Sequence, residues 1–298
     1  MIKFIVIGAS GFVGRKVLSH LENLNISSTG TARSQDLFSN LINFEIGKDE
    51  INPLVENVTH AIVPASVSNY FECETNPQAY ETNVELIPEL IAQLLQKHIK
   101  VNYISSNTVF GGNISWPLEN ETTKKDLDFE YARQKQRAER KIIESAIRLK
   151  QEDNLSITRL TKVISRIVSP FEEWHKLFSN NRPVSPFTNL IFAPITLKYA
   201  AENIVKISEN SGGIYHLSGS ENISYEEFCY LFAESFQFNK DLIHPTTSII
   251  ENVRIPFLPT FSGLGMKSTR DNLGIYPQNK QEVIDYLKGE FNEFNQKS

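Results

Sequence analysis

Apolar and polar residues follow two different periods in the first half of the chain. Short runs rich in β-branched and apolar residues predict strands at Ile2–Ile7, Ser28–Ala32, Leu41–Ile46, His60–Val63, Val101–Ser105 and Ser156–Leu160. Between several of these runs, apolar residues recur at helical spacing, which predicts helices over Asn76–His98 and from about Lys125 to Lys150. Strands that alternate with helices indicate βαβ units and a parallel sheet.

The second half of the chain has a different pattern. Prolines interrupt an aromatic stretch that begins near residue 165, and the later segments predict helices and one strand, at Thr196–Ser208, Gly213–Ser218, Ser224–Phe236 and Glu282–Phe294. We therefore predict an α/β fold with two parts. Residues 1–165, with a returning segment near 190–210, form a doubly wound parallel sheet, and residues 166–298 form a smaller α/β substrate-binding domain.

The first predicted strand runs into a glycine-spaced turn, Gly8, Gly11 and Gly14, and a helical pattern follows it. In a Rossmann-like sheet, such glycines allow a sharp turn, a close approach of the backbone to a pyrophosphate, and tight packing of helix on strand. The helix start then directs free N–H groups at the phosphates. We predict that a dinucleotide contacts Gly8, Ser10, Gly11, Phe12, Val13 and Gly14; the alternative is a tight βα turn without a ligand.

Arg33 follows the second predicted strand, at the position where an acidic residue would bind the ribose hydroxyls of NAD. A guanidinium favours a 2′-phosphate instead. The sequence therefore predicts NADP as the cofactor, with NAD as the alternative. The alternative role of Arg33 is a solvated charge at a strand end.

Tyr131 and Lys135 stand four positions apart on the predicted charged helix, so they share one face. A nearby ammonium should lower the pKa of a tyrosine and suit it to general acid/base work. Ser106 follows the Val101–Ser105 strand and is expected at the carboxyl edge of the sheet. We predict Ser106, Tyr131 and Lys135 as catalytic residues, the last two also contacting the cofactor. A tyrosine and a lysine at this spacing are also common on solvated helix surfaces.

Together, the glycine turn, the Tyr131–Lys135 pair and the strand-end serine resemble the extended short-chain dehydrogenases/reductases. The resemblance implies that Ser106 is the catalytic serine and that Asn83, in Glu81-Thr82-Asn83-Val84, is the structural and proton-relay asparagine near the cofactor. Residues Gly213 to Gly219 look like the closing part of the dTDP-4-dehydrorhamnose reductase branch. That branch implies an NADP-dependent reduction of a 4-keto-6-deoxy sugar nucleotide.

The sequence departs from that branch near the substrate. Asn107 and Thr108 stand where the branch often has an acid and a tyrosine, and Asn189–Pro194 replaces a polar segment. A nucleotide-sugar epimerase or dehydratase is one alternative function, although a dehydratase needs an acid/base pair beside the serine. A non-catalytic NADP-binding regulatory subunit is another.

The composition and net charge of the chain exclude several classes of partner and of site. The 298 residues carry a formal net charge of -5, which argues against a nucleic-acid or anionic-membrane surface. The two cysteines are far apart and the histidines are scattered, so we expect no disulfide framework and no metal site. No apolar run is long enough to span a bilayer. We expect a cytoplasmic protein with a small-molecule nucleotide-sugar substrate, and a homodimer is an open alternative.

Overall fold

The computed structural model describes residues 2–33, 40–124 and 126–297. Within them, seven parallel strands form one sheet in the order β10-β6-β5-β4-β1-β2-β3. These strands are β1 (Lys3–Ile7), β2 (Ser27–Ala32), β3 (Ile42–Asn43), β4 (His60–Val63), β5 (Lys100–Ser106), β6 (Leu155–Leu160) and β10 (Gly213–Leu217). The strand order reverses beside β1, and ligands of such sheets bind in the crevice at that point. The predicted Rossmann-like doubly wound fold is confirmed.

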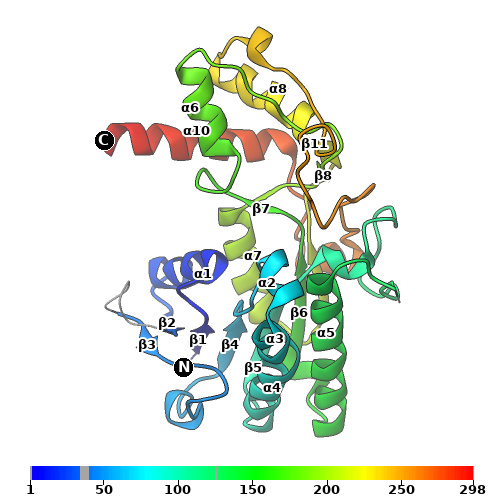
Figure 1. The fold of residues 1–298 in the computed structure, drawn as a ribbon. Helices are drawn as coiled ribbons and strands as arrows, with labels where there is room; N and C mark the ends of the chain where they lie inside the picture. The colour runs from blue at the N-terminus through cyan, green and yellow to red at the C-terminus, as the bar shows by residue number, and fades with distance from the viewer. Residues whose placement is uncertain (1, 34–39, 125, 298) are drawn as a thin grey trace.

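Helices cover both faces of the sheet (Figure 1). The strand residues alternate between two cores: Phe4 and Val6 pack against one set of helices, and Ile5 and Ile7 against the other. The first face carries α1 (Phe12–Asn23), α7 (Leu197–Ser208) and α9 (Lys267–Leu273). The second face carries α4 (Ile87–Gln96) and α5 (Glu130–Leu149).

Three predicted elements differ from the structure. The Leu41–Ile46 strand shortens to β3, an edge strand of two residues, because the chain turns at Glu45, whose N–H donates to Asp49. The Asn76–His98 helix is broken into α3 (Pro77–Tyr80), a π-helical segment η2 (Glu81–Leu86) and α4. Helix α5 begins at Glu130 rather than near Lys125, a residue outside those described, because Leu127 and Phe129 are buried on the preceding extended segment.

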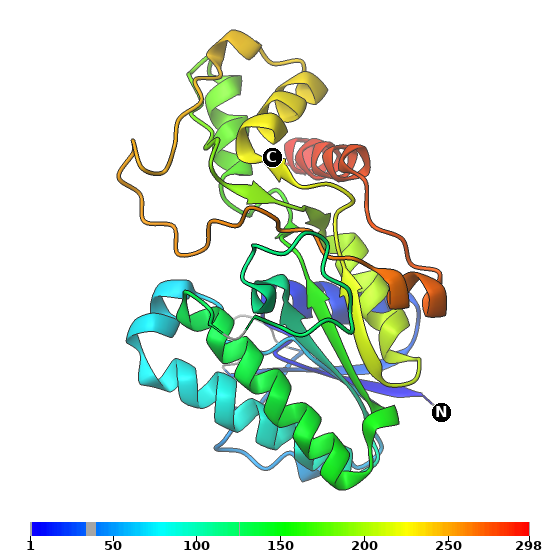
Figure 2. The same cartoon turned by 90° about the vertical axis from the view of Figure 1, so that its right-hand side faces the viewer.

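Beyond the carboxyl edge of the sheet lies a second part, the C-terminal lobe (Figure 2). It contains α6 (Phe171–Ser179), α8 (Tyr225–Phe236) and α10 (Lys280–Lys297), and the antiparallel pair β8 (Ile191–Phe192) and β11 (Ile223–Ser224). Its core is aromatic: Phe171, Trp174, Phe228 and Phe232 are buried together. Ser224 caps α8, and its hydroxyl accepts from the Glu227 N–H in a capping box.

The chain returns from the lobe to the sheet more extensively than the predicted segment 190–210. The parallel pair β7 (Val163–Ile164) and β9 (Ile195–Thr196) leads into α7, and β10 then adds to the edge of the sheet beside β6. We therefore keep the division near residue 165 as a proposal in which the returning segment extends to Leu217.

The remaining short elements are α2 (Tyr70–Thr75) and the 3₁₀ turns η1 (Asn52–Leu54), η3 (Asn107–Phe110), η4 (Glu152–Asn154) and η5 (Lys240–Leu242).

In the described part of the chain, no helix has both the length and the apolar character needed to cross a bilayer.

Candidate active site

The glycine turn between β1 and α1 has the geometry that the sequence predicts. Gly8 adopts a φ of +92°, a conformation that side chains with a Cβ rarely take. A Cβ on Gly14 would lie 2.3 Å from the carbonyl oxygen of Gly8, so only glycine allows α1 to pack this closely on the strand. Gly11 caps α1 without a side chain, and the first turn of this helix carries no acidic residue. Its free N–H groups are therefore suited to an anion.

A cleft of about 860 Å³ runs from this turn to the C-terminal lobe. Its sheet side includes Gly8, Gly11, Phe12, Val13, Gly14, Ser106, Tyr131 and Lys135. Its lobe side includes Leu190, Ile191, Phe192, Tyr225 and the segment from Arg254 to Phe257. The three predicted catalytic residues and five of the predicted turn contacts thus line one cavity. Its size is that of a site for a substantial ligand.

Tyr131 is on the first turn of α5, and its ring is almost fully buried between other aromatic side chains. Its ring centroid lies 5.2 Å from that of Tyr70 and 6.5 Å from that of Phe129. Burial raises the pKa of Tyr131, and the Ser106 side chain only partly opposes this rise. The predicted lowering of this pKa by Lys135 is wrong, because burial of the phenol dominates. Tyr131 is therefore a neutral phenol at pH 7, which can donate a proton.

Two serines at the end of β5 have separate partners. The Ser105 hydroxyl donates to the buried carboxylate of Glu139. The Ser106 hydroxyl oxygen accepts from the N–H of Thr108 at 3.2 Å and from its hydroxyl at 3.1 Å. Thr108 thereby fixes the orientation of Ser106, whose side chain remains half-buried at the cleft.

Lys135 lies one helical turn beyond Tyr131. Its Nζ donates to the Tyr103 hydroxyl at 3.2 Å and to the Ile104 carbonyl at 3.0 Å, and stands 6.0 Å from the centroid of the Tyr131 ring. Burial lowers the pKa of Lys135 to about 8, although the negative charge of Glu139 opposes this effect. The ammonium is thus held at a fixed position beside the end of β5.

Glu139, the next residue on the same helix face, was not singled out from the sequence. It forms a buried ion pair with Arg159 of β6 at 2.7 Å, and Arg159 also contacts His216 of β10 at 3.4 Å. The i, i+4, i+8 spacing of Tyr131, Lys135 and Glu139 was a signal that could have found it. This ion pair fastens α5 to the strands beside the cleft.

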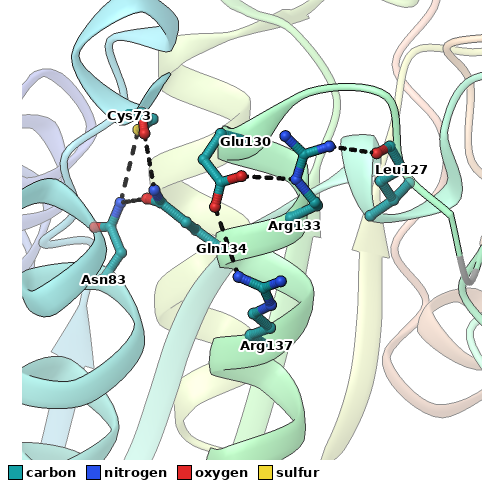
Figure 3. A network of polar contacts seen from close by, with 7 residues as sticks. All are labelled: Cys73, Asn83, Leu127, Glu130, Arg133, Gln134 and Arg137. Carbon is teal, nitrogen blue, oxygen red and sulfur yellow. Dashed lines mark hydrogen bonds and ion pairs between the residues drawn. The ribbon is translucent and has the colours of Figure 1, made fainter. Parts of the chain in front are cut away.

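Three predicted cofactor contacts lie outside the residues that line the cleft in the described part of the chain: Ser10, Arg33 and Asn83. Asn83 is in the π-helical segment, where its Oδ1 accepts from the Val67 N–H at 2.9 Å and its Nδ2 donates to Gln134 at 2.8 Å. Gln134 in turn donates to the Cys73 carbonyl (Figure 3). Asn83 therefore holds α2 and α5 together. The roles of all three toward a cofactor stay predictions.

Several cleft residues escaped sequence reasoning. Tyr70 and Glu74 come from α2, and Arg254 comes from the loop before α9, which crosses between lobe and sheet in orange in Figure 2. Arg254 and Glu74 form an ion pair at 2.9 Å. A loop without periodicity gives no sequence signal for such a contact. Lys162, by contrast, follows β6 by two residues, and its position beyond a strand end was readable.

A model of the RmlD substrate binding domain family matches residues 2–290. The chain belongs to this family. The resemblance to extended short-chain dehydrogenases/reductases is thereby confirmed, together with the expectation of an enzyme of that type. A search of curated proteins found no match.

Solved structures of similar fold have low sequence identity to this chain. A dTDP-4-dehydrorhamnose reductase from Bacillus anthracis in complex with NADP has a TM-score of 0.79 and 16% identity, over 97% of this chain and 99% of that one. A UDP-N-acetylglucosamine 4-epimerase from Methanobrevibacter ruminantium, in complex with UDP-N-acetylmuramic acid, has a TM-score of 0.82 and 14% identity, over 100% and 99%. A UDP-glucuronic acid 4-epimerase from Bacillus cereus, with UDP-4-deoxy-4-fluoro-glucuronic acid and NAD, has a TM-score of 0.79 and 15% identity, over 98% and 100%. These likenesses show a shared fold.

Proposed function

We propose that this protein is an NADP-dependent oxidoreductase that reduces a 4-keto-6-deoxy sugar nucleotide, in a cytoplasmic pathway of polysaccharide biosynthesis. The observation that carries the proposal is the cleft itself, in which Ser106, Tyr131 and Lys135 lie between a glycine turn and an aromatic lobe wall. The solved reductase with NADP and the epimerases with UDP-sugars support both ligand classes.

A bound nicotinamide cofactor would supply the hydride. The turn residues fit such a group, because Gly11 carries no side chain at the start of α1 and Gly14 allows α1 to pack close to β1. Ser106 would hold the ketone oxygen by a hydrogen bond, and Tyr131 would donate a proton to it. The raised pKa of Tyr131 keeps the phenol protonated near neutral pH, as a proton donor must be. Lys135 would bind the cofactor ribose and offset the charge of the phenolate left behind.

The carboxylates of the cleft argue against dehydration. Among the described lining residues, Glu74 is the one carboxylate, and it is paired with Arg254. Asn107, beside Ser106, donates to the Ser262 carbonyl at 2.8 Å. Neither residue offers the free acid/base pair that a dehydratase needs.

The test is oxidation of NADPH with a panel of 4-keto sugar nucleotides, followed by absorbance, with NADH in parallel. Turnover of one of them supports the proposal. Interconversion of a sugar nucleotide at C4 without net oxidation of NADPH would indicate an epimerase. Binding of NADPH without turnover of any panel member would favour the regulatory subunit.

A further inference from the structure

Lys162 stands between the catalytic residues and the lobe. In the sheet register Leu160 of β6 lies beside Ser106 of β5, and Lys162 follows two residues later, where its carbonyl accepts from the Ile195 N–H at 3.0 Å. Lys162 is among the residues that line the cleft. Lys162 is therefore fixed at its backbone and lies just beyond the point where a substrate ketone would meet Ser106.

The other charges of the cleft have partners. Arg254 is paired with Glu74, and Lys135 donates to Tyr103 and Ile104 with Glu139 nearby. Within the described residues, the Lys162 ammonium has no hydrogen bond or ion pair to a protein group, and the residue is exposed at the cleft. The cleft wall also includes the apolar residues Val163 and Leu190. An ammonium without a protein partner at the cleft wall can form a charge-assisted hydrogen bond with an anionic group of a ligand.

The diphosphate of the cofactor is not that anion. It is expected at the glycine turn after β1, and β6 is separated from β1 by β4 and β5. At about 4.8 Å per strand, Lys162 lies about 14 Å along the sheet from that turn. The anion must therefore belong to the ligand on the lobe side of the cleft.

We propose that Lys162 is a specificity-determining residue that binds an anionic oxygen group of the substrate, either the diphosphate of a sugar nucleotide or a carboxylate on its sugar. This rests on the proposed function in that it assigns the substrate to the same cleft. The residue acts on binding, and the hydride and proton transfers remain with the cofactor and Tyr131.

The experiment measures dissociation constants by calorimetry at saturating NADPH, which fills the glycine turn. The ligands are UDP-glucose and UDP-glucuronic acid, which differ by one carboxylate, and uridine as the uncharged reference. The variants are Lys162→Met, Lys162→Arg and, as a matched loss of charge, Lys206→Met, an exposed lysine of α7 that does not line the cleft.

If Lys162 binds the carboxylate, Lys162→Met lowers the affinity for UDP-glucuronic acid about tenfold to hundredfold and leaves the affinity for UDP-glucose unchanged. If Lys162 binds the diphosphate, the affinities for both nucleotide sugars fall by the same factor, and the affinity for uridine does not change. Lys162→Arg restores at least part of the affinity in either case. Unchanged affinities in Lys162→Met, or equal losses in Lys206→Met, would overturn the proposal.

Failure of the proposed function gives a different result. If the unaltered protein with NADPH bound takes up neither UDP sugar and also turns over no member of the 4-keto sugar nucleotide panel, the proposed substrate class is wrong. The anion site is then tested with inorganic pyrophosphate and D-glucuronate in the same variants. A loss of affinity confined to Lys162→Met supports the site, and equal binding by all variants rejects it.

Discussion

The two walls of the cleft are built differently. On the sheet side, the polar groups are held by named partners: Ser106 by Thr108, and Lys135 by Tyr103 and Ile104. On the lobe side, the wall is largely apolar and aromatic, and its one cation from the loop before α9, Arg254, is mostly exposed. The difference indicates that the chemistry is positioned by the sheet, while the lobe supplies a surface that selects the substrate.

This contrast has a physical basis. Parallel strands end at one edge, so side chains on β5, β6 and α5 meet there with little freedom. The lobe wall comes from short strands and a long loop, whose positions depend on packing of the aromatic core. A change in the sheet wall should therefore alter turnover or folding, whereas a change in the lobe wall should alter mainly binding.

The largest effect is expected from Tyr131→Phe, which removes one hydroxyl of the sheet wall and keeps the ring. Turnover should fall about 10²–10⁴-fold because the proton donor is lost. The affinity for NADPH should be nearly unchanged, as measured by fluorescence titration. A matched control is Tyr225→Phe on the lobe wall, which should change KM more than kcat. A Tyr131→Phe enzyme that keeps full turnover would refute the assigned chemistry.

Glu139→Gln should remove the buried ion pair that holds α5 against β6 in the sheet wall. The side chains of Glu139 and Arg159 are only 4% and 3% exposed, so the substitution leaves a buried guanidinium uncompensated. The free energy of unfolding should drop by about 3–5 kcal/mol, measured with denaturant. Glu144→Gln, on the exposed side of the same helix, should change it by less than about 1 kcal/mol. Equal effects of the two substitutions would mean that the buried ion pair contributes no more to the free energy of unfolding than an exposed one.

Arg33→Ala tests the cofactor end of the sheet wall. If Arg33 binds the 2′-phosphate, the unaltered protein prefers NADPH to NADH, and the substitution removes about 1.5–3 kcal/mol of that preference. Dissociation constants for both cofactors measure the effect, with Arg140→Ala as an exposed control. Equal affinity of the unaltered protein for NADPH and NADH would contradict the prediction.

The pH dependence of stability should single out Lys135. Its pKa in the folded protein, about 8, lies below the ordinary lysine value, so the unfolded chain binds more protons between pH 8 and about 10.4. Relative to Lys135→Met, the unaltered protein should therefore gain stability as pH rises through this window, by at most about 1.4 kcal/mol per pH unit. A difference that is constant with pH would show that Lys135 is not desolvated.

The smallest effect is expected from Arg254→Ala, which removes the ion pair between the two walls. Arg254 is 75% exposed, so its pair with Glu74 is screened by solvent. The free energy of unfolding should change by less than about 1 kcal/mol. A decrease of more than about 2 kcal/mol in the free energy of unfolding would mean that the Arg254–Glu74 pair stabilises the protein more than its solvent exposure indicates.

The sheet wall was largely readable from the sequence. The glycine turn, the strand order of a βαβ fold and the spacing of Tyr131 and Lys135 are local patterns, and they bring these residues to one edge. The pKa of Tyr131 was not readable, because it depends on burial against Tyr70 and Phe129 from separate segments. The sequence suggested a lowering by Lys135, and the structure shows a rise.

The lobe wall was much harder to predict. Leu190 and Phe192 were noted only as a departure from a related branch, and Arg254 lies in a loop without period. Trp174 has the side chain of a typical sugar contact, but it is buried in the lobe core with Phe171 and Phe232. Packing between segments far apart in the sequence decides which aromatic residues face a cleft. The local spacing of residues therefore does not predict it.

The repeated passage of the chain between the two parts has a mechanical consequence. The crossings are bound to one another: β7 pairs with β9, Gln278 accepts from the Thr196 N–H at 2.7 Å, and the Ser220 N–H donates to the Gln278 carbonyl at 2.8 Å. A lobe joined along such a line can rotate about it as a hinge, but it cannot swing freely on a single tether. A fragment that ended at residue 165 would also lose β10 and leave β6 as an unpaired edge, open to association with other chains.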